Sequence, residues 1–545
     1  MNKYFIFLGF TILFLATRVN LNFPVTLDEA KEAYTSFSII ESGKDTNGEI
    51  PSLLFRGDNN YLSVIPIYLR VISVIFWGLG SFGVRIPGVV AGILGLFVFY
   101  KLSRLLFSKQ VSLIAALVLS ASPFFVQMNI FSLSQTLSIL TLMAAFYFFV
   151  KKKTHAFLIS ILLSILSSFW VLPACLVIVI YYFYRQRGVK ITLYYFVGIC
   201  VFLGIIFINY PRLGTYLVGQ SIVQDLKPSS YTFEIDKRLS FGKLISSPLI
   251  TQKFNYNRLV FNKAYYGLTV FFKNLVKPFD YELLTSSFQA QTILSKERID
   301  TVALPKIFFW EAPLIFFGII LALRKRSKEI YILFIASLTS LIVFGQKSFY
   351  ILLPPLVWLN ALSLSYILDN RTKVFSKAIL IILIFLFLGS YLDFVYRLNT
   401  QKLLWGNPES VAQYKIWNYI DKEDLGKEKI IITDRLGDPA FYYLFYSRLS
   451  PQFFQQGKTI SHAPIDGEDR ILKIGDIEFR AFKYSESLKS KNELWIGLPG
   501  EFVGEKKDFS KITEVPRGKI ITKISSIKQE NVLLGDEIWI VRISE

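Results

Sequence analysis

Long apolar runs alternate with short basic clusters over the first 394 residues of the chain. A transmembrane helix needs about 20 consecutive apolar residues. Nine runs fit one crossing each, at about residues 4–20, 83–106, 111–130, 133–150, 191–209, 307–323, 330–345, 348–367 and 376–394. The longer run 156–184 has basic residues at both ends, which predicts two short helices that turn near residues 168–173. The pattern therefore predicts about eleven crossings, the first of them uncleaved because no small-residue cleavage pattern follows it.

The basic clusters predict how these helices are oriented. Lys and Arg gather in the short cytoplasmic loops of membrane proteins. The clusters lie at residues 101–109, 151–153, 185–190, 324–328 and 371–377. With these clusters inside, the N-terminus is cytoplasmic and two long loops, 18–82 and 210–305, face outward. The apolar stretch 61–79 is predicted to be a helix on the outer surface, because a crossing there would place the cluster at 101–109 outside.

The hydrophobic pattern changes after residue 394. Residues 1–394 are predicted to form a membrane domain, and residues 395–545 a small α/β domain on the outer side. A helical period covers 409–421, and short β-like runs follow it. These runs are 429–433, 476–480, 494–497, 519–527 and 537–541. The sequence after residue 395 has no glycine-rich nucleotide motif, no P-loop and no Cys/His cluster.

The composition excludes several classes of function. Hydrophobic residues make up 53% of the chain and charged residues 18%, which indicates a multi-pass protein of the plasma membrane, in contact with the lipid bilayer. The formal net charge of +20 would suit nucleic acid, but the surplus lies in the predicted cytoplasmic clusters, so no nucleic-acid partner is expected. Cys175 and Cys200 both lie in apolar runs, which excludes a disulfide framework or a zinc site.

The first outer loop is acidic, and its most regular feature begins directly after the first crossing. Thr26 followed by Glu29 has the spacing of a capping box, and apolar residues then recur at helical spacing. An amphipathic helix is therefore expected, with Asp28 and Glu29 in its first turn. Because the helix dipole alone favours acids there, this pattern by itself leaves a structural and a catalytic role open.

Several short motifs occur in a fixed order around this helix. They are Asp28-Glu29-Ala30, Gly43 with Asp45, Arg56-Gly57, Pro66-Ile-Tyr68, Gly83-Val-Arg85-Ile-Pro87, Ser122-Pro123 and Phe261-Asn-Lys263. In this order the motifs resemble those of the GT-C glycosyltransferases, a superfamily of polytopic α-helical membrane enzymes. Within it the chain is similar to the protein O-mannosyltransferases and the bacterial lipid A aminoarabinose transferases. The resemblance is densest at residues 26–87, and beyond residue 305 it rests on hydropathy.

The resemblance implies a glycosyltransferase that moves a sugar from a polyprenyl-phosphate donor to a hydroxyl acceptor of a protein, lipid or glycan on the outer face. It places Asp28 and Glu29 in an outward-facing cavity. Direct displacement at an anomeric carbon needs one general base and inverts the centre, and Asp28 is expected to be that base. Glu29 could hold the helix turn, assist the acceptor, or bind a divalent cation with Asp28. No other cofactor is predicted.

The donor phosphate needs cationic partners, and arginine suits it because its donors form a fixed fork. Arg56 and Arg85 are the expected ligands, although Arg85 could equally anchor its helix at the membrane surface. Lys263 lies in a basic and aromatic loop suited to a lipid headgroup or a sugar phosphate. Relatives have a lysine before the motif at Pro66 and an acid after the third crossing. This chain lacks both, and Asp45 could supply the second acid.

Two other classes of function stay open. A transporter or lipid flippase that couples to ions usually has ionisable residues or broken helices at mid-membrane, often in repeated halves. The sequence has no such repeat and keeps its acids near the outer rim, which favours the enzyme. The remaining alternative is an inactive relative that serves as a scaffold.

Overall fold

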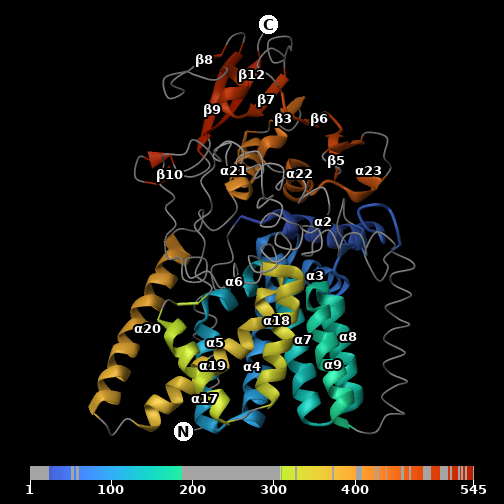
Figure 1. The fold of residues 1–545 in the computed structure, drawn as a ribbon. Coiled ribbons are helices and arrows are strands. Elements are labelled where there is room, and N and C mark those ends of the chain that lie inside the picture. Colours follow the sequence, from blue (N-terminus) through green and yellow to red (C-terminus); the bar gives the residue numbers. More distant parts are fainter. Residues whose placement is uncertain are drawn as a thin grey trace, which may run out of the picture.

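A computed structural model of the 545-residue chain is shown in Figure 1. It describes residues 24–186 and 307–543 with short gaps, the longest of which are 51–54, 57–60, 401–407, 456–459, 483–492 and 504–513. Residues 1–23 and 187–306 lie outside the described part of the chain. The predicted crossings at 4–20 and 191–209 and the outer loop 210–305 are therefore not described.

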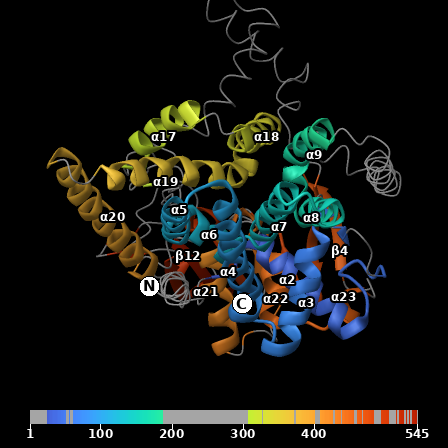
Figure 2. The same ribbon diagram turned by 90° about the horizontal axis from the view of Figure 1, so that it is seen from below.

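The membrane part consists of apolar helices that run side by side (Figures 1 and 2). They are α4 (Ser81–Leu106), α5 (Lys109–Ala121), α6 (Pro123–Phe131), α7 (Leu133–Val150), α8 (Thr154–Ser167), α9 (Leu172–Gln186), α17 (Glu311–Lys325), α18 (Lys328–Phe344), α19 (Leu353–Asp369) and α20 (Val374–Thr400). Among the described residues, 4 helices are long and apolar enough to cross a membrane, or 5 if a bent pair counts as one. An integral membrane protein is thereby established, and the total of eleven crossings stays a prediction.

Aromatic and small polar side chains hold these helices together. The Trp358 ring of α19 stacks on Phe99 of α4 at 5.5 Å between centroids, and its indole N–H donates to Ser103 Oγ over 2.8 Å. Between α7 and α8, the Ser164 hydroxyl donates to the Ser138 carbonyl over 2.8 Å. Helix α20 is the exception, because only 6% of its apolar window is buried and it stands apart from the others in both views.

The apolar run 111–130, which was predicted to form one crossing, is a bent pair of helices that can count as one span. Helices α5 and α6 meet at an angle of 56°. Ser122, the residue between them, has an extended backbone with φ −60° and ψ 123°. Proline disfavours the helical conformation of the residue before it and has no N–H to continue the ladder, and residue 123 is a proline. Because of this bend, α6 runs in a different direction from α5.

The predicted turn within the run 156–184 is confirmed. Helix α8 ends at Ser167, a short 3₁₀ turn η1 (Phe169–Val171) follows, and α9 begins at Leu172. Ser168 has an extended backbone and is buried. Its hydroxyl oxygen accepts a hydrogen bond from the hydroxyl of Tyr350 over 3.1 Å, which fixes the turn against η3 (Gly345–Leu352).

Two helices, α2 (Leu27–Ser42) and α3 (Val64–Trp77), lie across one end of the membrane helices (Figure 1). Helix α2 begins at the expected capping box and ends at Gly43, whose φ of 70° favours glycine. Helix α3 occupies the apolar stretch that was predicted to be a surface helix. Two short strands, β1 (Phe55–Arg56) and β2 (Tyr61–Leu62), pair between the two helices.

The C-terminal part is an α/β domain, as the strand-like runs predict. Its sheet has the order β4-β5-β6-β3-β7-β12-β9-β8, and β3 pairs parallel with both β6 and β7. The strands are β3 (Ile430–Ile432), β4 (Ile460–Ile465), β5 (Glu468–Ile474), β6 (Ile477–Phe479), β7 (Glu493–Gly497), β8 (Glu514–Val515), β9 (Gly518–Ser525) and β12 (Glu537–Ile543), and a separate hairpin is formed by β10 (Lys528–Gln529) and β11 (Val532–Leu533). The helices are α21 (Pro408–Lys422), α22 (Pro439–Ser447), α23 (Pro451–Gln455) and α25 (Pro499–Val503).

One hydrophobic cluster joins α2 to this C-terminal domain. Ala33 and Tyr34 of α2 pack in the same buried cluster as Ile416 of α21 and Phe445 of α22. Helices α21 and α22 lie between the sheet and α2 in Figure 1. The proposed domain boundary at residue 395 divides the sequence, but the apolar core next to α2 contains residues from both sides of it.

Candidate active site

The start of α2 is fixed by a buried carboxylate. The Thr26 hydroxyl accepts a hydrogen bond from the Glu29 N–H over 3.3 Å, and the Glu29 carboxylate accepts one from the Thr26 N–H over 2.9 Å. The same carboxylate faces Arg85 of α4. Arg85 Nε donates to Glu29 Oε1 and Arg85 Nη2 to Glu29 Oε2, each over 2.8 Å. Both side chains are 1% exposed.

Arg85 makes two further contacts that hold this corner together. Its Nη2 donates to the carbonyl of Pro24 over 3.0 Å, directly before α2. Its guanidinium lies over the ring of Phe131, the last residue of α6, at 5.3 Å from the centroid. One arginine therefore connects the entry to α2, the start of α4 and the end of the bent α6.

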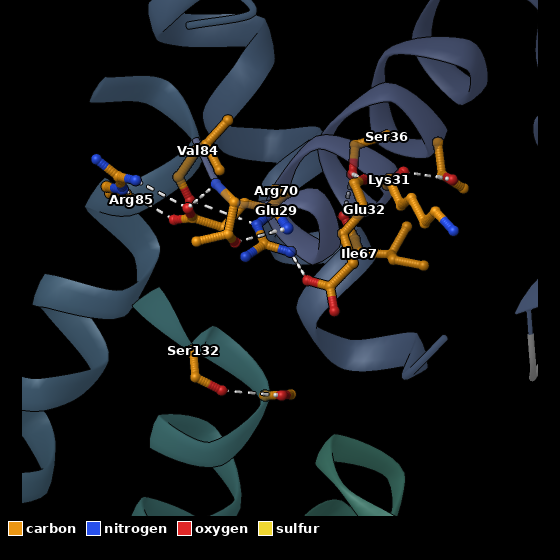
Figure 3. A network of polar contacts seen from close by, with 12 residues as sticks. Glu29, Lys31, Glu32, Ser36, Ile67, Arg70, Val84, Arg85 and Ser132 are labelled. Atoms are coloured by element: carbon orange, nitrogen blue, oxygen red, sulfur yellow. Dashed lines mark hydrogen bonds and ion pairs between the residues drawn. The ribbon is translucent and has the colours of Figure 1, made fainter. Parts of the chain in front are cut away.

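A second ion pair lies beside the first one (Figure 3). Arg70 of α3 pairs with Glu32 of α2, and its Nε donates to the carbonyl of Val84 over 3.4 Å. The Ser36 hydroxyl of α2 donates to the carbonyl of Ile67 in α3 over 3.2 Å. Helices α2, α3 and α4 are thus joined by buried charged and polar groups, whose geometry is well defined because each acid has an arginine partner.

Asp28 differs from its neighbour Glu29 in its exposure to solvent and in its contacts. Its side chain is exposed, and among the described residues its carboxylate makes no hydrogen bond and no ion pair. It does interact electrostatically with Arg70 and with Lys347. Asp28 is therefore an accessible carboxylate on a helix end that is held by the buried Glu29–Arg85 pair.

Lys347 is a site residue that the sequence interpretation missed. It belongs to η3, and its ammonium group lies over the ring of Trp170 at 5.2 Å from the centroid. The side chain is exposed, and Asp28 lies within its electrostatic reach. The available signal was a lone lysine in the otherwise apolar stretch between residues 330 and 367. The structure thus places one acid and one base of opposite charge at the same end of the helix bundle.

Of the other predicted site residues, Asp45 is not brought to Asp28. Asp45 follows the far end of α2, roughly 20 Å along the helix at 1.5 Å per residue. It accepts hydrogen bonds from the N–H groups of Asn47 and Glu49, each over 2.9 Å, and burial raises its pKa. This is the geometry of a loop-closing residue. Only the backbone of Arg56 is described, in β1, and Lys263 lies outside the described residues.

Asp28 and Glu29 are the acids that could bind a divalent cation according to the sequence. Both carboxylate oxygens of Glu29 are hydrogen-bonded, which leaves Asp28 as the accessible acid of the pair. Within residues 24–186 and 307–543, no group of three or more His, Cys, Asp or Glu side chains has the spacing of a metal site. At the start of α2 an exposed acid, Asp28, therefore lies directly beside a buried and fully hydrogen-bonded one, Glu29.

The fold and site can be compared with known proteins. A family model described as dolichyl-phosphate-mannose-protein mannosyltransferase matches residues 64–210, from the start of α3 onward. No curated protein matches the chain in sequence.

Solved structures of two proteins align with this chain. The chain aligns with ArnT from Cupriavidus metallidurans bound to undecaprenyl phosphate, with a TM-score of 0.50, 12% identity, and coverage of 98% of this chain and 97% of ArnT. It also aligns with the oligosaccharyltransferase AglB from Archaeoglobus fulgidus, in complex with an inhibitory peptide and a dolichol-phosphate, with a TM-score of 0.46 and 15% identity. This alignment covers 82% of the chain and 64% of AglB, so the chain spans less than two thirds of AglB.

The likeness to ArnT shows that this is a GT-C fold, a helical membrane bundle with a C-terminal soluble domain. The family model over residues 64–210 and the fold shared with ArnT both agree with the expected resemblance to the GT-C glycosyltransferases.

Proposed function

We propose that this protein is an integral-membrane glycosyltransferase that moves a sugar from a polyprenyl-phosphate donor to a hydroxyl acceptor on the outer face of the membrane. The observation that carries the proposal is the exposed carboxylate of Asp28, which has no hydrogen bond or ion pair to any residue that the structure describes. It stands on a helix end that is held by the buried Glu29–Arg85 pair. The fold supports it, and ArnT, which shares that fold, is described as bound to undecaprenyl phosphate.

Asp28 acts as the general base in this proposal. The acceptor hydroxyl attacks the anomeric carbon, a new carbon–oxygen bond forms, and the bond from that carbon to the phosphate oxygen breaks. The proton of the hydroxyl passes to Asp28, and the polyprenyl phosphate leaves with its electron pair. Attack from the side opposite the leaving group inverts the anomeric centre. A positioned general base of this kind contributes about 10²–10⁴-fold to a rate.

Glu29 and Arg85 position Asp28. Glu29 uses both oxygens on Arg85 and Thr26, so its role is to hold the helix turn. Arg85 donates to Glu29 from both Nε and Nη2, and to the carbonyl of Pro24 from Nη2. This division of roles departs from the expectation that Arg85 binds the donor phosphate.

Lys347 is the proposed partner of the leaving phosphate. A phosphate group that departs from the anomeric carbon gains charge, and a nearby ammonium group stabilises it. Lys347 is exposed, faces the side of the bundle where Asp28 lies, and makes no ion pair in the described part of the chain. Arg56 and Lys263 remain further candidates for the same phosphate. Asp45 remains a candidate for the acceptor side only if the loop at the far end of α2 moves.

The test uses the full-length protein in lipid nanodiscs. A panel of radiolabelled polyprenyl-phosphate sugars is offered with protein, lipid and glycan acceptors, and transfer is followed by label in the acceptor and by free polyprenyl phosphate. Asp28→Asn should reduce transfer by about 10²–10⁴-fold. Glu41→Gln, which changes an exposed acid near the other end of α2, is the matched control and should keep full activity.

Two outcomes would overturn the proposal. Undiminished transfer by Asp28→Asn would remove Asp28 as the base. A flippase would instead show no transfer from any donor in nanodiscs. After reconstitution into closed lipid vesicles, it would move the labelled lipid across the membrane. The anomeric configuration of the product, read by NMR, tests inversion separately.

A further inference from the structure

A group of large apolar side chains is exposed on the second half of α3 and at the start of α4. These side chains, the α3 patch, are Ile72 (54% exposed), Ile75 (60%), Phe76 (73%), Trp77 (51%) and Phe82 (49%). Three aromatic rings follow one another along the patch. The ring centroids of Phe76 and Trp77 are 5.8 Å apart, and those of Trp77 and Phe82 are 6.4 Å apart. The patch is therefore one connected apolar surface.

The side of α3 that faces the protein is different from the side that carries the patch. Arg70, which is the charged residue of α3, is 2% exposed and pairs with Glu32 of α2. Ser73 and Val74 are buried as well. The α3 patch thus has no charged side chain of its own helix beside it. A connected apolar surface of this kind usually marks a contact with another protein or with a membrane.

The α3 patch continues into the exposed side of α4. Val90, Leu94 and Phe97 follow Phe82 at helical spacing, and each of the three is 43–51% exposed. Helix α4 is long and apolar enough to cross a membrane, so this exposed side lies against lipid. It ends at Lys101, an exposed residue of a predicted cytoplasmic cluster. Because the patch extends a surface that contacts lipid, lipid is its expected partner.

The length of α4 gives the depth of the patch in the bilayer. Phe82 and Lys101 are about 29 Å apart along the helix axis, at 1.5 Å per residue. The hydrocarbon core of a bilayer is about 30 Å thick. With Lys101 at one boundary of the core, Phe82 lies at the other. Since α3 lies across this end of the bundle (Figure 1), Trp77 is at the same level, where aromatic residues are enriched in membrane proteins.

We propose that the α3 patch binds the membrane leaflet on the side of α2, at the boundary between headgroups and acyl chains. The sequence predicts a surface helix, and the structure adds which side chains enter the leaflet and how deep they lie. Helix α2 is attached to α3 by the Arg70–Glu32 pair and by the hydrogen bond from Ser36 to the carbonyl of Ile67. The anchored α3 therefore sets the height of α2 above the acyl chains.

A second protein is a less suitable partner for this surface. A stable protein interface buries about 800 Å² and roughly 20–30 residues on each side. The α3 patch consists of five side chains. An amphipathic helix with exposed Trp, Phe and aliphatic residues, by contrast, buries its apolar face about 5–10 Å into the boundary of a leaflet.

The test uses the full-length protein in lipid nanodiscs, with both native cysteines replaced by alanine. A nitroxide spin label is attached in turn at Ile72→Cys and Phe76→Cys in the patch. Leu94→Cys on α4 is the reference for the acyl chains, and Glu423→Cys, at an exposed position of the C-terminal domain, is the reference for water. EPR measures how often each label collides with oxygen, which concentrates in acyl chains, and with a water-soluble nickel chelate.

The ratio of oxygen collisions to nickel collisions should be at least about threefold higher at residues 72 and 76 than at residue 423, and lower than at residue 94. A ratio equal to that at residue 423 would place the patch in water and overturn the inference. Infrequent collisions with both reagents would show that protein covers the patch, which would also overturn it. A ratio equal to that at residue 94 would contradict the proposed depth.

This experiment is independent of the proposed function. It needs no sugar donor and no acceptor, so a protein that transfers no sugar can still have an anchored α3. Conversely, an active enzyme whose labels at residues 72 and 76 behave like the label at residue 423 would keep the proposed function and lose the anchor.

Discussion

Arg85 and Glu29 form a bidentate ion pair in which both N···O distances are 2.8 Å and both side chains are 1% exposed. They stand 56 positions apart in the sequence, on α4 and α2. Because the pair is withdrawn from water, it is sensitive to the loss of either partner. The neighbouring Asp28 is exposed.

Glu29→Gln should destabilise the protein strongly. It leaves the Arg85 guanidinium buried without a counter-charge, and breaking a buried pair in this way costs about 3–5 kcal/mol. Thermal unfolding in detergent measures the effect, with Glu41→Gln as the exposed control on the same helix. The double variant Glu29→Met/Arg85→Met should recover part of the stability, because two apolar side chains leave no charge buried. A single variant as stable as the wild type would contradict this account.

Lys347→Ala should weaken the use of the donor without harming the fold. A hydrogen bond to a charged group contributes about 1.5–3 kcal/mol, which corresponds to roughly 10–100-fold in kcat/KM for the donor. The melting temperature should change little, since the side chain is exposed. Lys347→Arg should keep much of the activity. Lys101→Ala removes another exposed lysine that lies over an aromatic ring, Phe97, and should have no effect. Equal activity of Lys347→Ala and Lys101→Ala would remove Lys347 from the site.

Gly88→Ala should separate α4 from α6. A Cβ at residue 88 would lie 2.3 Å from the carbonyl oxygen of Asn129, so the two backbones must move apart. Overpacking of this kind costs about 1–3 kcal/mol. Gly95→Ala on the same helix would meet only side-chain atoms at 3.7 Å or more and should be nearly neutral. The melting temperatures of the two variants test this prediction. A lower melting temperature for Gly95→Ala than for Gly88→Ala would refute the close approach of α4 to α6 at Gly88.

Glu501 should make the stability of the C-terminal domain depend on pH. Burial raises its pKa, although the Leu498 N–H and the Thr433 hydroxyl donate to its carboxylate over 2.8 Å each. Because the pKa of the folded state lies above that of the unfolded state, the native protein binds more protons in this window. The contribution of Glu501 to stability is present below the unfolded pKa of about 4.3 and is lost as the pH rises through the folded pKa.

The matching experiment compares Glu501→Gln with the wild type in a series of melting temperatures from pH 4 to pH 8. The difference in stability between wild type and Glu501→Gln should shift in favour of the variant as the pH rises. Glu423→Gln, at an exposed position in the same domain, should show a smaller trend. A flat difference for Glu501→Gln would show that its carboxylate titrates as in the unfolded chain.

Local patterns in the sequence predicted the elements well. The Thr26–Glu29 spacing correctly predicted how α2 starts, and the uninterrupted apolar run 133–150 correctly predicted α7. The bend at Ser122 was not predicted, because hydropathy reports only that a segment is apolar. The proline that causes the bend was visible but was interpreted only as part of a family motif.

The site was harder to predict than the elements, because its contacts are between residues far apart in the chain. Asp28 and Glu29 were identified together, but only the structure separates an exposed acid from a buried one. The sequence does not show that Arg85 pairs with Glu29, because this contact depends on how α2 packs on α4. The candidate residue Lys347 was missed because it is a single lysine in an apolar run, with no local pattern around it.

The contact between Tyr34 and Leu449 spans 415 positions of the chain. At synthesis rates of about 5–20 residues per second, the partner surface for α2 emerges roughly 20–80 seconds after α2 itself. During that interval Ala33 and Tyr34, which are fully buried in the finished protein, have no apolar surface of α21 and α22 to pack on. The packing of α2 is therefore completed among the last events in the synthesis of the protein, so a ribosome that stalls before residue 449 leaves α2 without the C-terminal surface that covers it.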